Sequence, residues 1–152
     1  MPKPTGIVWS VSDSAGLNAS RRLPDLARDY FQAGRDLVRA QASSAVFHKF
    51  RLKTKRFRYT LELFQPCYGP GLEQRLQALR HIQDLLGEIN DCATTKKLLG
   101  RMTINISTYL DRRIEWKKRA LRSYWRRVFD ADGQETWWTD YLAHYARGAR
   151  RS

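Results

Sequence analysis

The sequence predicts an all-α protein, folded as an antiparallel four-helix bundle with a short extra C-terminal helix. Three observations lead to this fold class. Apolar residues recur at steps of three and four over several long stretches, which is the spacing of one helix face. No stretch alternates apolar and polar residues as a half-buried strand does. The long stretches are joined by short links containing Gly and Pro, which suits neighbouring antiparallel helices.

The length of 152 residues suits one domain with a substantial core. Residues 1–20 are rich in Ser, Gly and Pro, so we expect a loosely ordered leader whose apolar residues 7–9 dock on the body. The helical bundle is expected over residues 21–147. Residues 148–152 are expected to form a basic tail.

The first two helices are predicted over residues 21–43 and 47–64. Gly34 weakens the first only slightly. The second contains neither Gly nor Pro and is the most regular stretch of the chain. Its core face is predicted from residues at helical steps: Phe47, Phe50, Thr54, Phe57, Leu61 and Phe64. Pro66 follows its end, and residues 67–71 are predicted to be a loop by their Pro and Gly content.

The third helix is predicted over residues 72–99, where apolar residues repeat every seven positions. Gly87 inside it is interpreted as a point of close helix–helix approach. The fourth helix is predicted over residues 103–130. Its expected core residues are Leu110, Ile114, Leu121, Trp125 and Val128, and arginines and lysines coat the rest.

A short last helix is predicted over residues 135–147, after a break at Gly133. It carries the adjacent aromatic residues Trp137 and Trp138. We assign both to packing in the core or at an interface; a stacking platform for nucleic-acid bases is the alternative.

The charge balance is extreme: 28 Lys and Arg against 15 Asp and Glu, a net charge of +13. Such a surplus repels itself in a folded chain and indicates a negative partner, whether nucleic acid, an anionic membrane surface or a phosphorylated polymer. Cys67 and Cys92 are expected to be free thiols in a reducing compartment. We expect a cytoplasmic protein with no membrane partner, since no apolar run approaches about 20 residues and the first residues lack a signal-peptide core.

One face of the helix at 47–64 carries a stripe of cations. His48, Arg51, Lys55 and Arg58 lie within about 80° of one another and span about 15 Å along the axis. Arginine can donate two hydrogen bonds to phosphate oxygens, lysine acts as a point charge, and His48 is a further donor. Glu62 follows Arg58 by one turn, so we expect an i,i+4 ion pair that holds Arg58 in place.

A third, apolar stripe on this helix consists of Leu52, Tyr59 and Leu63, nearly opposite the core face. These residues need cover from elsewhere. A second copy of the chain can supply it. The alternative is cover by the last helix or by the leader.

The second and third predicted helices carry a pattern that resembles a known family. The matching residues are His48-x-x-Arg51-x-x-x-Lys55-Arg56-x-Arg58-Tyr59, Leu61-Glu62-Leu63-Phe64 and Gln83-Asp84-x-Leu86-Gly87-x-x-Asn90-Asp91. This pattern resembles the CHAD domain, the conserved-histidine α-helical domain, whose members bind inorganic polyphosphate. The resemblance covers residues 47–99.

The resemblance implies a polyphosphate-binding helical bundle. The family has two four-helix bundles related by pseudo-two-fold symmetry, with basic residues from both lining a channel. This chain resembles the C-terminal half alone, so the resemblance implies either half a site or a homodimer that rebuilds the whole one.

The residues predicted to bind polyphosphate are His48, Arg51, Lys55, Arg58, Arg56, Lys49, Arg80 and Lys97. Lys49 and Arg56 lie on the other side of their helix, together with Lys53, and ordinary solvated surface is the alternative for them. Arg80 and Lys97 would extend the basic surface from the third helix. Asn90 and Asp91 match the family pattern but are assigned a structural role, at a helix end or orienting a basic side chain.

The predicted function is non-catalytic binding of inorganic polyphosphate or another polyanion, in the cytoplasm and with polyphosphate granules as a further location. A helical DNA- or RNA-binding protein is the alternative, because the net charge and the Arg-rich fourth helix fit it equally well. No enzyme, metal or cofactor is expected. The carboxylates are scattered, and the chain has no Walker-type loop and no zinc-ligand spacing.

Overall fold

The computed structural model describes residues 9–39, 41–99 and 104–148, and these residues form helices and links without any strand. The elements are α1 (Ala15–Arg39), α2 (Ser44–Leu63), α3 (Gln65–Tyr68), α4 (Gly71–Leu99), α5 (Ile104–Tyr124), the π-helical turn η1 (Trp125–Phe129) and α6 (Gln134–His144). The predicted all-α class is confirmed. No helix in the described ranges is long and apolar enough to cross a bilayer.

Two serine caps decide where the first helices begin. The Ser14 hydroxyl accepts a hydrogen bond from the backbone N–H of Leu17 at 3.1 Å, so α1 starts at Ala15 and not at residue 21. The Ser43 hydroxyl likewise accepts from the N–H of Val46 at 3.4 Å and caps α2. Residues 41–43, which were predicted to end the first helix, therefore belong to the link between α1 and α2.

The segment before α1 contacts the body through Trp9, whose ring stacks on Phe64 with centroids 5.2 Å apart. The predicted docking of the leader is confirmed for this residue. The rest of the prediction, at Ile7 and Val8, lies outside the described residues, as do positions 149–152 of the predicted tail.

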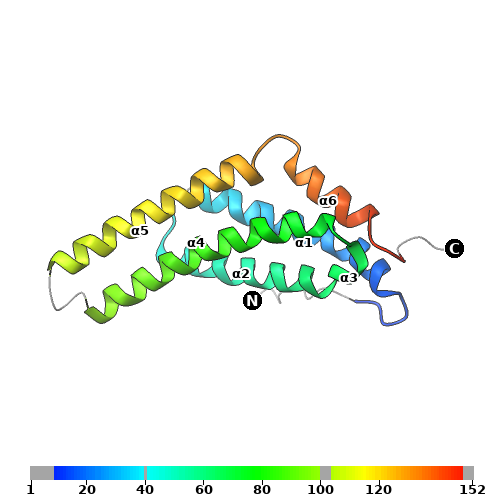
Figure 1. Cartoon of the computed structure of the whole chain (residues 1–152), viewed down its shortest axis with the longest axis horizontal. Helices are drawn as coiled ribbons and strands as arrows, with labels where there is room; N and C mark the ends of the chain where they lie inside the picture. Colours follow the sequence, from blue (N-terminus) through cyan, green and yellow to red (C-terminus); the bar gives the residue numbers. More distant parts are fainter. Residues whose placement is uncertain (1–8, 40, 100–103, 149–152) are drawn as a thin grey trace.

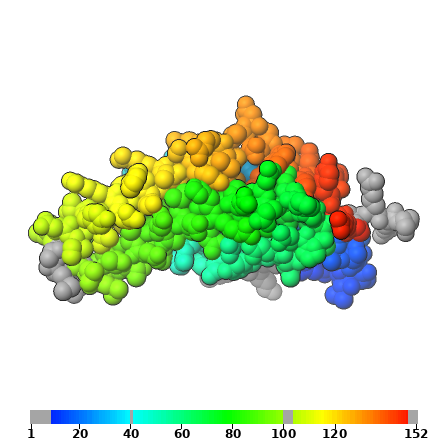
Figure 2. Space-filling model, in the orientation of Figure 1, coloured from blue at the N-terminus to red at the C-terminus, as the bar shows by residue number. Residues whose placement is uncertain are grey.

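The helices are arranged in an elongated molecule (Figure 1 and Figure 2). α1 packs against α2 and α6, α2 packs against α4, and α4 packs against α5. The α4–α5 hairpin extends past the ends of α1 and α2 and forms one end of the molecule (Figure 1). The last third of the chain is thus divided, with α5 along α4 and α6 along α1.

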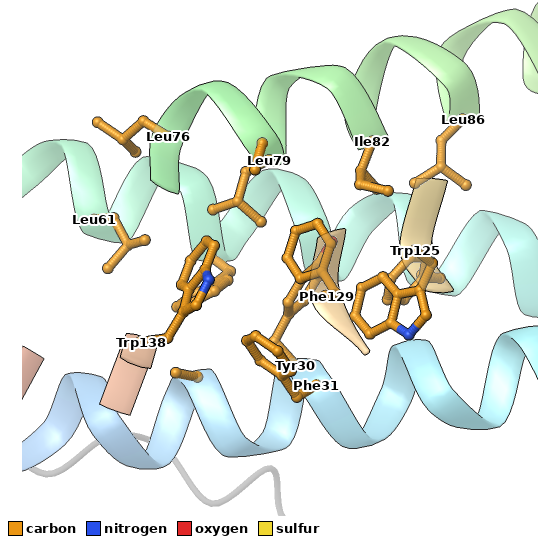
Figure 3. Close-up of a cluster of buried hydrophobic side chains, with 14 of the residues drawn as sticks. Tyr30, Phe31, Leu61, Leu76, Leu79, Ile82, Leu86, Trp125, Phe129 and Trp138 are labelled. Atoms are coloured by element: carbon orange, nitrogen blue, oxygen red, sulfur yellow. The ribbon is translucent and has the colours of Figure 1, made fainter. Parts of the chain in front are cut away.

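The core is centred on Tyr30 of α1, which is fully buried. Its ring lies 5.2 Å from that of Phe50 and 5.0 Å from that of Phe57, both on α2. Figure 3 shows aromatic side chains from α1, η1 and α6 meeting a row of leucines and isoleucine from α4. Trp138 is among them, which confirms its predicted packing role.

The π-helical turn sets the position of two of these rings. The Asp130 N–H donates to the carbonyl of Trp125 at 2.9 Å, a bond between residues five apart that makes the turn wider than an α-turn. Trp125 and Phe129 consequently stack in the core, with centroids 4.4 Å apart. Arg126 and Arg127 of the same turn point to solvent.

Gly34 of α1 and Gly87 of α4 have opposite surroundings. A Cβ on Gly34 would overlap the Trp125 ring, so this glycine allows the tryptophan to approach α1 closely. A Cβ on Gly87 would meet no atom within 4 Å. The predicted close helix approach at Gly87 is therefore wrong, and it occurs at Gly34 instead.

The predicted loop at residues 67–71 is partly helical, because α3 continues to Tyr68 before Gly69 turns the chain with a φ of 80°. Arg75 of α4 then joins this corner to α6. Its guanidinium lies between the rings of Trp137 and Tyr141, 3.4 and 3.9 Å from their centroids. Burial lowers the pKa of Arg75 to about 10.

Candidate functional site

A pocket of about 370 Å³ lies where the first turns of α2 meet α4 and α5. Three of the predicted cations, His48, Arg51 and Lys97, line it together. Phe47, Leu86 and Ile89 form part of its apolar wall. The pocket therefore brings together cations from the second and third predicted helices, which lie almost fifty residues apart in the chain.

The pocket lining is positively charged and contains no carboxylate. Among the described residues, the side chains of His48, Arg51 and Lys97 have no ion pair or hydrogen bond with another side chain. Asn90 adds an amide to the same wall. An anion entering this pocket would meet donors that are not already occupied.

The other end of the stripe is neutralised by carboxylates. Arg58 Nε lies 3.7 Å from Glu62 Oε1, which confirms the predicted i,i+4 pair. Arg80 reaches the same Glu62 oxygen at 3.5 Å and Glu73 Oε1 at 2.7 Å. The hydrogen bond from Arg80 to Glu73 raises the pKa of Arg80 above its ordinary value. Two cations and two carboxylates thus balance at this end.

Arg58 is also the more enclosed of these two arginines. Its guanidinium lies 4.8 Å from the ring centroid of Tyr59, and its Nε is buried without a hydrogen-bond partner in the described residues. Between this end and the pocket, Gly87 lies on the same face of α4 as Arg80 and Asn90. Since no atom lies near its Cβ direction, the space along that face is open.

The apolar stripe of α2 is exposed. Leu52, Tyr59 and Leu63 are 45%, 48% and 74% exposed, and they border a shallow hollow together with Lys55 and Arg56. Lys49 lies exposed on the same helix.

Cover of this stripe by the last helix, one alternative to a second copy of the chain, is wrong. Trp138 of α6 is buried in the core and Trp137 stacks on Arg75. Cover by residues 1–8 lies outside the described part of the chain.

Lys118 and Asn90 line the pocket although the sequence analysis did not include them among the binding residues. Lys118 of α5 lines it, with Nζ 4.8 Å from the ring centroid of Phe47. It stands in a run of similar basic residues, so no sequence signal separates it from its neighbours. Asn90 was assigned to a helix end or to orienting a basic side chain; α4 continues to Leu99, so it lies inside the helix.

Among the residues that the structure describes, no group of three or more His, Cys, Asp or Glu side chains is placed to hold a metal ion. What the pocket offers instead is a set of hydrogen-bond donors from His48, Arg51, Lys97 and Lys118, with the positive charge of the last three. Such a set can bind phosphate or other anionic oxygens.

The fold and the site together define an all-helical protein with a basic pocket between its helices. The family model of the CHAD domain matches residues 7–100. The chain therefore belongs to the CHAD domain family, and the match spans α1 to α4, with α5, η1 and α6 beyond it. No curated protein and no solved structure matches the chain.

Proposed function

We propose that this protein binds inorganic polyphosphate, without catalysis, in the cytoplasm. The observation that carries the proposal is the pocket in which His48, Arg51 and Lys97 converge without a carboxylate. Three further predicted cations would extend the positive field along α2. Lys55 and Arg56 lie at the exposed hollow, and Lys49 lies on the same helix. Arg58 and Arg80 would contribute to the extent that a ligand displaces Glu62 and Glu73.

Polyphosphate suits this arrangement because it presents a line of negative oxygens and no bases. Arg51 can donate two hydrogen bonds to one phosphate, and Lys97 can contact the next phosphate as a point charge. Both side chains project from helices, so they are held in place before the ligand arrives, which lowers the ordering cost of binding.

We further propose that two chains pair through the stripe of Leu52, Tyr59 and Leu63. These side chains form an apolar strip on a helix whose other faces are basic or buried. The two-bundle arrangement implied by the family resemblance supports a second copy as the occupant. Pairing would place Lys55 and Arg56 beside the same residues of the partner chain, so the interface would border a basic groove.

The first test is competition at physiological salt between long-chain polyphosphate and a labelled DNA duplex. We expect polyphosphate to displace the duplex, with an affinity that falls steeply as salt rises because bound counterions are released. If the duplex remains bound, the protein is a nucleic-acid binder and the proposal is wrong. A phosphate-release assay with and without magnesium tests the non-catalytic part, which turnover would contradict.

The second test is the substitution Arg51→Ala, with Lys53→Ala as the matched control. Both remove one positive charge from α2, but Arg51 lines the pocket and Lys53 is exposed outside it. A forked charge-assisted interaction contributes about 1.5–3 kcal/mol to binding. Its removal should therefore weaken polyphosphate binding by about tenfold or more. The control should change it by less than about twofold. Equal effects would mean that net charge, and not the pocket, determines binding.

A further inference from the structure

A second basic groove lies on the other side of Lys118. It occupies about 1040 Å³ between the end of α1, the link that follows it, and the outer face of α5 and η1. Its positive side chains are Arg39, Lys118, Arg119, Arg122, Arg126 and Arg127. Glu115 is the one carboxylate in the described lining, and it lies 3.8 Å from Lys118.

This concentration of charge does not stabilise the helix that carries it. Arg119, Arg122 and Arg126 follow one another at steps of three and four, so they face the same side and repel each other. None of these three has an ion pair within the described residues. An anion in the groove would remove this repulsion.

The composition of the groove favours a chain of phosphates over a single-stranded nucleic acid. Its described lining contains no aromatic side chain on which a base could stack. It offers arginines, whose forked donors fit phosphate oxygens. From Lys118 to Arg126 the positive side chains follow α5 into η1 for about 12 Å, at about 1.5 Å per residue.

Lys118 connects this groove to the pocket of His48, Arg51 and Lys97, because it lines both. We propose that the groove is a second polyphosphate-binding segment, continuous with the first through Lys118. One long chain then occupies both, whereas a short chain fills only the pocket. The inference rests on the proposed function. It concerns a part of the chain, α5 and η1, that lies beyond the residues matched by the family model.

The test compares tripolyphosphate with long-chain polyphosphate, using the variant Arg119→Ala/Arg122→Ala/Arg126→Ala. The control is Arg28→Ala/Lys53→Ala/Arg147→Ala, which removes three exposed cations from outside both cavities. We expect the affinity of the groove variant to fall by about tenfold or more for the long chain and by less than about twofold for tripolyphosphate. Its salt dependence should also become shallower, by about 0.7 in log–log slope for each phosphate that the variant no longer neutralises. The control should keep wild-type affinity for both within about twofold.

The outcomes separate the two proposals. If the wild-type protein binds neither polyphosphate, the proposed function fails. If it binds both and the groove variant loses affinity for both equally, or for neither, the proposed function holds and the extended site is wrong. If the groove variant loses affinity for a DNA duplex but not for long polyphosphate, the groove belongs to a nucleic acid and the inference is overturned.

Discussion

Lys118 on α5 places its Nζ 4.8 Å from the ring centroid of Phe47 on α2, over the face of a buried aromatic side chain. An ammonium group in this position is attracted by the negative face of the ring. The contact therefore holds a positive charge where the pocket and the second groove meet. It also ties α5, which buries few of its own side chains, to the start of the helix that carries the cationic stripe.

Glu62 limits the charge that the stripe can offer, since it contacts both Arg58 and Arg80. Glu62→Gln should free Arg58 for phosphate and raise the affinity for polyphosphate several-fold at low salt, whereas Arg80 stays paired with Glu73 at 2.7 Å. The cost in unfolding free energy should stay within about 1 kcal/mol, because both ion pairs are partly exposed. Isothermal titration and chemical denaturation measure the two effects.

Glu115→Gln is a useful comparison, because this carboxylate contacts Lys118, which lines both the pocket and the second groove, and contacts no cation of the stripe. Unchanged or weaker binding by Glu62→Gln would place Arg58 outside the site, together with the ion-paired Arg80. Their role would then be to join α2 to α4.

The exposed apolar stripe of α2 predicts the oligomeric state. Leu52→Asp/Tyr59→Asp puts two charges where pairing would bury apolar side chains, so it should convert a dimer to a monomer in light scattering. The helix content should not change, because both side chains already face solvent within one chain. Leu98→Asp is the control, an exposed apolar residue at the far end of α4. A wild-type protein that is monomeric at micromolar concentration would rule out pairing.

The core face of α2 could be predicted because it depends on local periodicity. Phe47, Phe50, Thr54, Phe57 and Leu61 are all buried as expected. The same pattern implied that Leu52, Tyr59 and Leu63 do not face that core, since a helix cannot turn two opposite faces to one core. These conclusions need only the angle between residues along one helix.

The remaining features depend on which helices meet, and periodicity does not contain that information. Lys118 and Arg119 look alike in the sequence, yet only the first of them reaches the pocket of α2 and α4. Glu62 reaches Arg80 because α4 lies beside α2 at that level. The glycine at the close approach was likewise misplaced, at Gly87 instead of Gly34, because the tryptophan that requires it comes from a π-helical turn far along the chain.

These two glycines predict opposite effects of the same substitution. Gly34→Ala gains up to about 1 kcal/mol in helix propensity but forces a methyl group into the buried Trp125 ring, an overpacking that costs about 1–3 kcal/mol or more. Trp125 is enclosed by other aromatic rings and cannot move aside, so the protein should be destabilised. Gly87→Ala gains the propensity with no steric conflict and should be stabilised by up to about 1 kcal/mol. Urea denaturation of both variants checks this, and a Gly34→Ala protein as stable as wild type would contradict the close approach.

Burial raises the pKa of Tyr30 and of Tyr68 far above the ordinary value of 10 and raises that of Tyr124 and Tyr141 as well. Above pH 10 the unfolded chain therefore releases phenolic protons that the folded chain retains, and each such tyrosine lowers the unfolding free energy by about 1.4 kcal/mol per pH unit. Arg75 acts in the opposite direction once the pH passes its folded pKa of about 10, because the folded chain then releases a proton that the unfolded chain retains. Its contribution therefore raises the unfolding free energy as the pH rises. Four tyrosines lower the unfolding free energy in this range and one arginine raises it. Stability should therefore decrease steeply from pH 10 upward.

Tyr30→Phe isolates one of these groups. It removes the hydrogen bond between Tyr30 Oη and Thr54 Oγ1, 2.9 Å long, and should cost about 1 kcal/mol at neutral pH, because Thr54 still donates to the carbonyl of Phe50. Above pH 10 its unfolding free energy should fall less steeply than that of the wild type, by about 1.4 kcal/mol per pH unit, so the two curves converge. Urea denaturation at pH 8, 10 and 11 measures both the loss of stability near neutral pH and the change in its pH dependence. Tyr109→Phe, which removes the hydroxyl of an exposed tyrosine of α5, is the matched control. Parallel curves for Tyr30→Phe and wild type would show that Tyr30 does not retain its proton in the folded core.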